Sequence, residues 1–170
     1  RGKYIAFIDS DDLWKKNKLH KQIKFMKQNN LDFSHTSYNI INEKNKIVGN
    51  FKIKENLNYK ELLRSCDIGL STVMVKRSVF FYNKFNNFKT KEDYSLWLKL
   101  AKKDVKIKGL NIKLTNFRKV KNSLSGSIIQ KLFDAYKVYY ISEKFGFFTS
   151  LFFILRLTLY AIKKKIKIST

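Results

Sequence analysis

The sequence predicts an α/β protein with a mixed sheet flanked by helices and a helical, basic C-terminal tail. Three observations predict it. Short apolar or β-branched runs alternate with segments whose apolar residues fall at helical spacing. The hydrophobic content of 44% over 170 residues is enough for one domain with a core. After Glu143 the chain carries no acidic residue and consists largely of long apolar stretches between lysines.

Each element follows from a local pattern. An apolar run that ends at a carboxylate cluster predicts a buried strand over 4–8. Leu19, Ile23 and Met26 at helical spacing predict an amphipathic helix over 15–28 whose apolar face they form. The clearest helix is 92–102. The remaining expected elements are strands at 33–41, 46–51, 70–75, 105–108 and 112–120, short helices at 59–64 and 77–81, a loop at 122–127, and helices at 128–145 and 148–166.

The net charge of +23 indicates an anionic partner or a lysine-rich compositional bias. A membrane surface fits such a charge, and so does nucleic acid. The chain lacks an aromatic RNA-binding signature and a Cys/His zinc spacing, so we expect no nucleic-acid partner. The single cysteine, Cys66, excludes an internal disulfide framework and suits a reducing compartment. Because Arg1 rather than Met opens the chain, we expect a segment upstream.

Three of the 13 acidic residues, Asp9, Asp11 and Asp12, stand within four positions at the end of the first predicted strand. Crowded carboxylates raise the cost of ionising one another, and Mg²⁺ or Mn²⁺ removes that cost. Ligand sites of open α/β sheets lie beyond the carboxyl ends of strands, where this cluster falls. The pattern therefore indicates a divalent-metal site. The alternative is a solvated turn that caps the following helix.

The segment from Gly2 to Trp14, GKYIAFIDSDDLW, resembles the central segment of family 2 inverting glycosyltransferases of the GT-A fold. The helix that follows in that family reads K-L-x-x-Q, and this chain has Lys18-Leu19-His20-Lys21-Gln22 there. The resemblance implies an incomplete Rossmann-like half, with residues 1–127 as the later portion of a catalytic domain and 128–170 as a tail. It also implies that Asp9, Asp11 and Asp12 bind the donor diphosphate through Mn²⁺ or Mg²⁺.

A second acidic site begins the helix at 92–102. Glu92 and Asp93 occupy its first turn, where the helix dipole favours ionised carboxylates, and that alone is a sufficient structural reason for them. Glu92-Asp93-Tyr94-Ser95-Leu96-Trp97-Leu98 also resembles the family's E-D-x-x-L-W-L element. By that resemblance Asp93 is the general base that deprotonates the acceptor hydroxyl, and Glu92 positions the acceptor. Transfer would then invert the anomeric carbon without a covalent enzyme intermediate.

Two further segments are similar to family elements. The strand expected at 70–75 resembles the one that borders the acceptor pocket. Residues 117–125 resemble a loop that closes over the donor phosphates, which implies donor contacts from Arg118 and Ser125. A guanidinium matches phosphate oxygens in a fork, although Arg118 is equally explained as a surface arginine.

Residues 146–162 form a 17-residue stretch whose only charge is Arg156, and lysines follow at once. A helix of that length spans about 26 Å, against a bilayer core of roughly 30 Å. The stretch favours a helix lying on an anionic membrane, with packing on the domain and a true span as alternatives.

Together with the family resemblance, these features lead us to expect a glycosyltransferase that moves a sugar from a nucleotide-diphosphate sugar to a saccharide or lipid-linked acceptor in bacterial surface polysaccharide synthesis. It would be cytoplasmic and peripheral on the inner face of the cell membrane. The alternative is an inactive fragment that binds membrane or nucleic acid.

Overall fold

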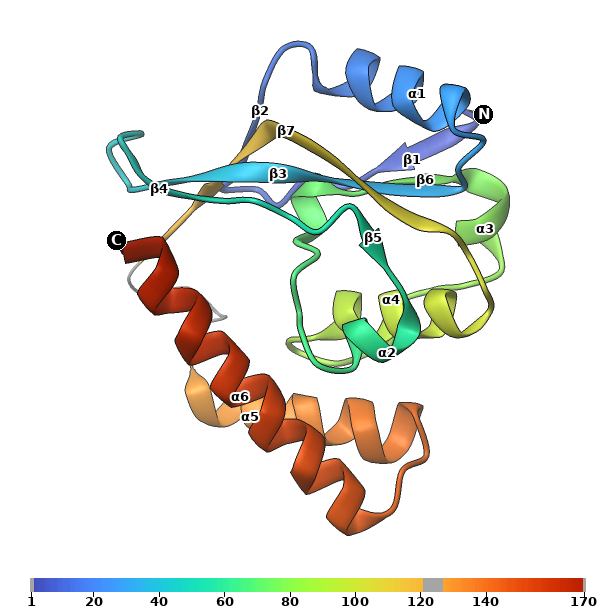
Figure 1. Cartoon of the computed structure of the whole chain (residues 1–170), viewed down its shortest axis with the longest axis vertical. Coiled ribbons are helices and arrows are strands. Elements are labelled where there is room, and N and C mark those ends of the chain that lie inside the picture. The colour runs from blue at the N-terminus through green and yellow to red at the C-terminus, as the bar shows by residue number, and fades with distance from the viewer. Residues whose placement is uncertain (1, 121–126, 170) are drawn as a thin grey trace.

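The sheet at the centre of the molecule is mixed (Figure 1). The computed structural model describes residues 2–120 and 127–169, the last five of these by their backbone only. The strand order is β1-β6-β3-β7-β2, with β4 beside β3 and β5 beside β7. Only β3 and β7 pair in parallel among the described strands. The bounds are β1 Tyr4–Ala6, β2 Leu13–Trp14, β3 Phe33–Ile41, β4 Ile47–Phe51, β5 Asn56–Leu57, β6 Met74–Lys76 and β7 Ile107–Arg118.

Helices cover both faces of this sheet (Figure 1). Helix α1 (Lys18–Gln28) lies on one face, and α2 (Tyr59–Leu62) and α4 (Glu92–Lys102) lie on the other. The alternation of β1 supplies both layers, because Tyr4 and Ala6 pack toward α1 while Ile5 and Phe7 join the core around α4. In that larger core the Phe33 ring meets the fully buried Trp97 ring edge-on.

Three predicted strands differ from the structure. Residues 70–72 form a 3-10 turn, η1 (Leu70–Thr72), because both the backbone N–H and the hydroxyl of Thr72 donate to the Gly69 carbonyl. Strand β6 begins only at Met74 and leads into α3 (Arg77–Phe81). The two strands expected at 105–108 and 112–120 are one strand, β7. Gly109 in this strand lets residues 53–55 approach closely, since a Cβ there would clash with the Ile53 side chain and lie 2.7 Å from the Lys54 carbonyl.

The buried face of α1 is the predicted one only in part, because Met26 is buried and Ile23 packs against the same small core, but Leu19 does not. Lys18, Gln22 and Met26 are its buried residues, whereas Leu19 is 44% exposed. The helix begins at Lys18 rather than at residue 15, because residues 13–14 pair with β7 as strand β2. Spacing predicted the helix and the burial of Met26 correctly, but the buried face is rotated toward Lys18 and Gln22 and away from Leu19.

The C-terminal helices pack on the α4 side of the molecule (Figure 1). Helix α5 (Ile128–Lys137) passes into a π-helical turn, η3 (Val138–Ser142), where a helix to residue 145 was expected, and α6 (Phe147–Ser169) follows. Ala135, Tyr139 and Leu157 belong to the same hydrophobic core as Trp97.

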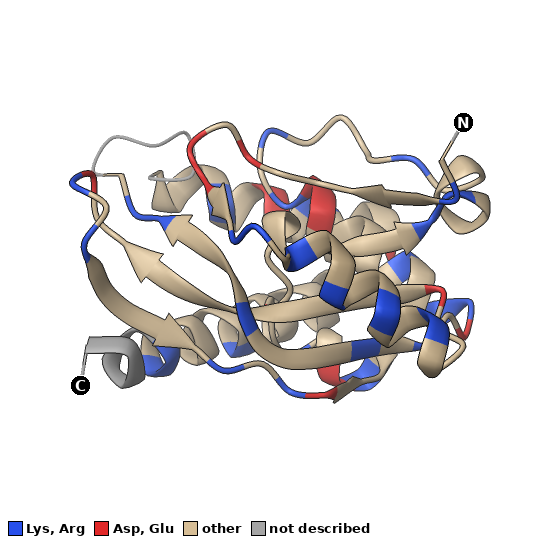
Figure 2. Cartoon of the chain, turned by 90° about the horizontal axis from the view of Figure 1, so that it is seen from above, with Lys and Arg blue, Asp and Glu red and all other residues tan. Residues whose placement is uncertain are grey.

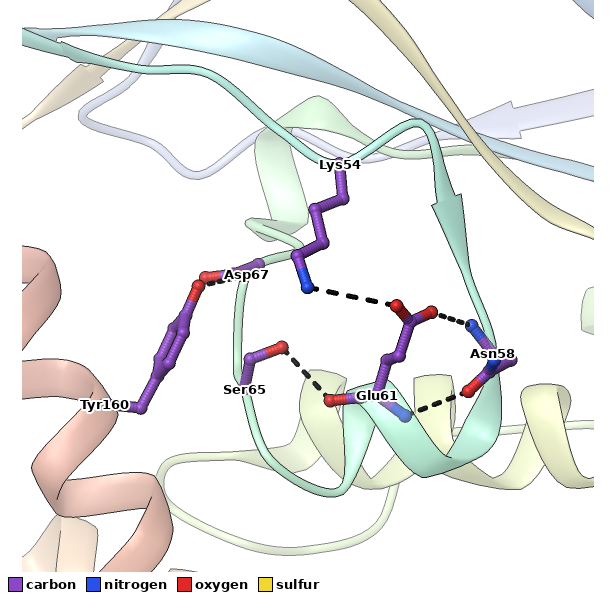
Figure 3. A network of polar contacts seen from close by, with 6 residues as sticks. All are labelled: Lys54, Asn58, Glu61, Ser65, Asp67 and Tyr160. Carbon is purple, nitrogen blue, oxygen red and sulfur yellow. Dashed lines mark hydrogen bonds and ion pairs between the residues drawn. The ribbon is translucent and has the colours of Figure 1, made fainter.

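Polar contacts tie the connecting segments together (Figure 3). Asn58 and Glu61 form a reciprocal capping box at the start of α2. A few residues later, the Asp67 carboxylate accepts a hydrogen bond from the Tyr160 hydroxyl of α6. The segment after α2 is thereby attached to the last helix.

Candidate active site

The acidic loop follows β1 and is held above α4 by aromatic packing. The Phe7 ring contacts Phe80, Phe85 and Trp97 at centroid distances of 5.3, 5.5 and 6.3 Å. Beyond Phe7 the backbone turns, with the Asp12 N–H donating to the Asp9 carbonyl at 3.1 Å. The end of β1 is therefore fixed on a rigid aromatic base, which places Asp9–Asp12 at the carboxyl end of the strand.

Ser71 in η1 is the main support of this loop, and sequence reasoning did not single it out. Its hydroxyl oxygen accepts the Asp9 N–H at 2.9 Å. Its carbonyl accepts the indole N–H of Trp14 at 2.8 Å and the Thr115 hydroxyl at 3.1 Å. One residue thus joins the acidic loop to β2 and β7. A serine in a Leu-Ser-Thr-Val run carries no sequence signal for such a role.

Helix α1 supports the site from the other face of the sheet through its K-L-x-x-Q residues. Gln22 donates to the carbonyl and hydroxyl of Ser34 and to the Thr72 carbonyl, at 3.0–3.2 Å. Lys18 donates to Gln22 Oε1 at 2.7 Å, and its ammonium lies 4.5 Å from the centroid of the Trp14 ring. Burial lowers the Lys18 pKa to about 7. These two side chains at i and i+4 fix α1 against η1.

The carboxylates of the loop are in different environments. Burial, followed by the charge of Asp11, raises the pKa of Asp9, although the Ser71 hydroxyl opposes this. Burial also raises the pKa of Asp12, against hydrogen bonds from Ser71 and the Arg118 backbone. Asp12 is only 4% exposed, and its Oδ1 accepts the Arg118 N–H at 2.7 Å. The other oxygen, Oδ2, is buried and has no hydrogen-bond partner among the described residues.

A divalent cation fits this loop as a partly protein-bound ion. No three side chains of the Asp, Glu, His or Cys type come together as a metal cage within 2–120 and 127–164. Mg²⁺ is commonly held by one or two carboxylates together with substrate phosphates, so a full cage is not required. The unpartnered Asp12 Oδ2 is an oxygen of the kind that such an ion takes as a ligand.

Arg118 at the end of β7 braces the loop. Its Nε donates to the Asp11 carbonyl at 2.7 Å. Its terminal nitrogens donate to the Asn42 carbonyl at 3.1 Å and to Asn45 Oδ1 at 2.8 Å, in the β3–β4 turn. The guanidinium is thus engaged with protein oxygens, and its contact with a donor diphosphate stays a prediction. Ser125, the other expected donor contact, lies outside the described residues.

The second acidic pair begins α4, as expected. Lys91 before it has a left-handed backbone, with φ of 67°, and Asp93 Oδ1 accepts the Tyr94 N–H at 2.6 Å. Thr90 lies just before Lys91 in the chain. Its N–H and its hydroxyl both donate to the buried Asp134 carboxylate of α5 at 2.9 Å. Helix α5 thereby fixes the turn that presents Asp93.

The two acidic sites lie close enough to influence each other. Burial, followed by the charge of Glu92, raises the Asp93 pKa to about 6, and Asp9 contributes to the increase. In Figure 2 the red stretch after β1 and the red first turn of α4 lie on the same side of the molecule. The structure therefore brings together two carboxylate groups that are more than eighty residues apart in the chain. A carboxyl group with a raised pKa beside a possible metal-phosphate site is suited to general-base chemistry.

Comparison with known proteins identifies the family. Residues 1–89 match the family described as Glycosyl transferase family 2. The chain belongs to this family. The sequence-based assignment to a family 2 glycosyltransferase is therefore confirmed.

Relatives of this family 2 chain include proteins named as glycosyltransferases. It is 33% identical over 167 residues to the putative teichuronic acid biosynthesis glycosyltransferase TuaG of Bacillus subtilis, covering 98% of this chain and 66% of TuaG. It is 40% identical over 134 residues to WfgD of Escherichia coli, named as a UDP-Glc:α-D-GlcNAc-diphosphoundecaprenol β-1,3-glucosyltransferase, covering 77% of this chain and 51% of WfgD. The chain thus spans about half to two thirds of these relatives.

The fold of this family 2 chain is also that of a solved glycosyltransferase. S. aureus TarS 1–349, determined in complex with UDP-GlcNAc, superposes with a TM-score of 0.63 at 18% identity, over 84% of this chain and 42% of TarS. At that identity the likeness concerns the fold alone. The predicted GT-A-like mixed sheet flanked by helices is confirmed.

Proposed function

We propose that this chain is the later part of an enzyme that transfers a sugar, with inversion, from a nucleotide-diphosphate sugar to a saccharide or lipid-linked acceptor in bacterial surface polysaccharide synthesis. The observation that carries the proposal is the meeting of the Asp9–Asp12 loop with Asp93 at the start of α4. TarS in complex with UDP-GlcNAc supports the donor class. WfgD, whose name includes a diphosphoundecaprenol acceptor, supports the acceptor class. Because such an acceptor is a lipid, we place the reaction at a membrane surface and propose the cytoplasmic face.

The residues divide the chemistry between two sides of the reacting carbon. On the donor side, the Asp9–Asp12 loop faces the diphosphate, with the Asp12 carboxylate and the exposed Asp11 carboxylate as the groups that would hold Mn²⁺ or Mg²⁺. When bound, that ion would neutralise charge on the departing diphosphate.

On the acceptor side, Asp93 takes the proton of the attacking hydroxyl, and Glu92 orients the acceptor. Because the base and the leaving group lie on opposite sides, a single displacement inverts the anomeric carbon. This order requires no covalent intermediate on the protein.

The test is donor binding by the full-length protein, followed by turnover. A UDP-sugar is titrated with and without Mn²⁺ into the wild type, Asp11→Ala and Asp93→Ala. We expect metal-dependent binding that Asp11→Ala weakens and Asp93→Ala retains, and turnover that both variants abolish. Asp104→Asn is the matched control, an exposed acidic residue just beyond the opposite end of α4.

Three outcomes contradict the proposal. They are donor binding without metal dependence, turnover unchanged in Asp11→Ala and Asp93→Ala, and a product with retained anomeric configuration by NMR. Absence of donor binding together with salt-sensitive binding to vesicles or oligonucleotides would instead favour a basic binding module.

A further inference from the structure

Helix α6 is apolar on two opposite sides, and only one of them is covered. The covered stripe comprises Ser150, Phe153, Ile154, Leu157 and Tyr160, at helical spacing, which face the domain. The opposite stripe, which we call the outer stripe, comprises Phe148, Leu151, Phe152, Leu155, Leu159 and Ile162 and is 44–83% exposed. A surface helix ordinarily has a polar outer face.

The covered stripe is firmly attached to the domain, so the outer stripe is not exposed through loose packing. Leu157 is 7% exposed, and the Phe153 ring stacks on Tyr139 and on Phe145. Near the end of the helix, Asp67 accepts bonds from the Tyr160 hydroxyl and from Lys164 Nζ (Figure 3 shows the first). The orientation of α6 is fixed by these contacts, and the outer stripe points away from the domain.

Helix α5 adds a second group of exposed apolar residues beside the start of α6. The Tyr136 ring of α5 meets the Phe147 ring edge-on at 6.4 Å. Four apolar side chains of α5 are 39–82% exposed: Ile128, Ile129, Leu132 and Phe133. Isolated exposed apolar residues are ordinary, but groups of them on two helices that contact each other mark an interaction surface.

The charge around this surface selects the partner. From Lys144 to the end, the chain has six basic residues and no acidic one. Arg156 lies over the Phe152 ring, at the border of the outer stripe, and Lys163 is exposed one turn beyond Leu159. Apolar side chains bordered by cations alone match a layer of anionic headgroups above a hydrocarbon interior.

We propose that the outer stripe of α6, together with the exposed apolar residues of α5, docks this protein on an anionic lipid surface, with α6 lying in the membrane plane. No helix in the part of the chain described by the structure is both long and apolar enough to span a bilayer. A helix of 23 residues lying flat extends about 35 Å along the surface.

The same contacts would orient the active site relative to the lipid. Helix α5 holds the turn before Asp93 through Asp134 and Thr90, and α6 holds the segment at Asp67. A docked tail therefore carries the acceptor side of the site with it. For the identity of the acceptor this inference rests on the proposed function, but docking itself is measured without turnover.

The test is sedimentation of the full-length protein with vesicles of phosphatidylcholine, with or without roughly a third of phosphatidylglycerol. We expect binding to the anionic vesicles that weakens at high salt. The double variant Phe148→Glu/Leu155→Glu should lower the bound fraction at least about tenfold, because both side chains would insert charge into the apolar layer. The matched control is Ile47→Glu/Val48→Glu on β4, whose side chains are 63% and 51% exposed. It should bind like the wild type.

Circular dichroism and UDP-sugar binding show whether the outer-stripe variant is folded. If it is not, Leu155→Ser/Leu159→Ser replaces it with a milder change on the same stripe. Unchanged vesicle binding by the folded variant overturns the proposal. So does a change in oligomeric state by light scattering without a change in vesicle binding, because a second copy would then cover the stripe. If docking is present but donor binding is absent, the proposed function fails while this inference stands.

Discussion

Asp93 is a carboxyl group whose surroundings prepare it for proton transfer. Burial and the nearby charges of Glu92 and Asp9 raise its pKa, while the Tyr94 N–H and Lys91 lower it, with a result of about 6. At neutral pH such a group is mostly ionised, yet it is a stronger base than an ordinary aspartate. The first turn of a helix alone would have lowered this pKa, so burial near a second acidic site outweighs the helix dipole.

This balance predicts how turnover depends on pH. Since the base must be ionised, kcat/KM should rise with pH and level off above about pH 7, with an inflection near the Asp93 pKa of about 6. Asp93→Asn should lower kcat by about a hundredfold or more and remove the inflection. Steady-state kinetics over pH check this, with Asp104→Asn as the control. An inflection that persists in Asp93→Asn would assign the base to another group.

Ser71 is a positioning residue, because its hydroxyl accepts the Asp9 N–H and also interacts with the Asp9 and Asp12 carboxylates. Ser71→Ala leaves that N–H without its acceptor and allows the loop to move. We expect kcat to fall about tenfold or more, since small misplacements of reacting groups are costly. Unfolding free energy should fall by about 1 to 3 kcal/mol. Kinetics and urea unfolding measure both effects.

Two further substitutions, Ser71→Thr and Ser150→Ala, distinguish the positioning role of Ser71 from a purely structural one. Ser71→Thr keeps the hydroxyl and should recover much of kcat. Ser150→Ala removes a buried hydroxyl that has no hydrogen-bond partner among the described residues, on a helix remote from the acidic loop. It should leave kcat unchanged. If Ser71→Ala loses stability but keeps kcat, the positioning role is wrong.

At the scale of elements, periodicity predicted where α1 lies and the burial of Met26, but not the burial of the polar residues Lys18 and Gln22. Apolar residues recur at Leu19, Ile23 and Met26, yet the sheet needs partners for Ser34 and for the carbonyl of Thr72. Gln22 supplies them, and Lys18 follows it inward because the two are one turn apart. A polar requirement in the partner element decided the orientation. No pattern within the helix itself contains that information.

The buried Lys18 predicts a stability that depends on pH. Its pKa falls from 10.5 to about 7 in the folded protein, so the folded state binds the proton less tightly than the unfolded state. The resulting penalty is complete below about pH 7 and disappears as pH rises toward the unfolded pKa near 10.5.

Lys18→Met keeps the aliphatic stem and removes the charge. We expect it to raise the unfolding free energy near neutral pH by on the order of 1 to 3 kcal/mol, after allowance for the lost contacts with Gln22 and Trp14. The difference from wild type should shrink as pH approaches about 10. Denaturant unfolding over pH measures it, with the exposed Lys21→Met of the same helix as control. Destabilisation of equal size at every pH would contradict the proposed penalty.

At the scale of the whole molecule, the elements were largely predictable and their joining was not. Strand β3, helix α4 and the apolar stretch of α6 follow from composition and spacing, because each has a strong local pattern. The Asp9–Asp12 loop and Asp93 were predicted as one site only through the resemblance to a family, since contacts between distant segments leave no local trace. The supports from Ser71, Asp134 and Asp67 come from the tertiary structure alone.

Asp67 is the polar contact that joins the end of the last helix to the rest of the molecule. Its side chain is 2% exposed and that of Lys164 is 18% exposed, so the pair is largely removed from water. Breaking a buried pair from one side is costly, because the remaining charge stays buried without its partner. A surface pair such as Asp32–Lys76, with side chains 44% and 35% exposed, is worth little.

This contrast predicts how α6 is released. Asp67→Ala should leave Lys164 and the Tyr160 hydroxyl without their shared acceptor, and the end of α6 should open. We expect hydrogen exchange of α6 amides to speed up by about tenfold or more while the amides of α4 are unaffected. Asp32→Ala, the surface control, should change neither helix. Equal acceleration in α4 and α6 would mean that the molecule opens as one unit, and that Asp67 contributes to overall stability rather than holding the tail in place.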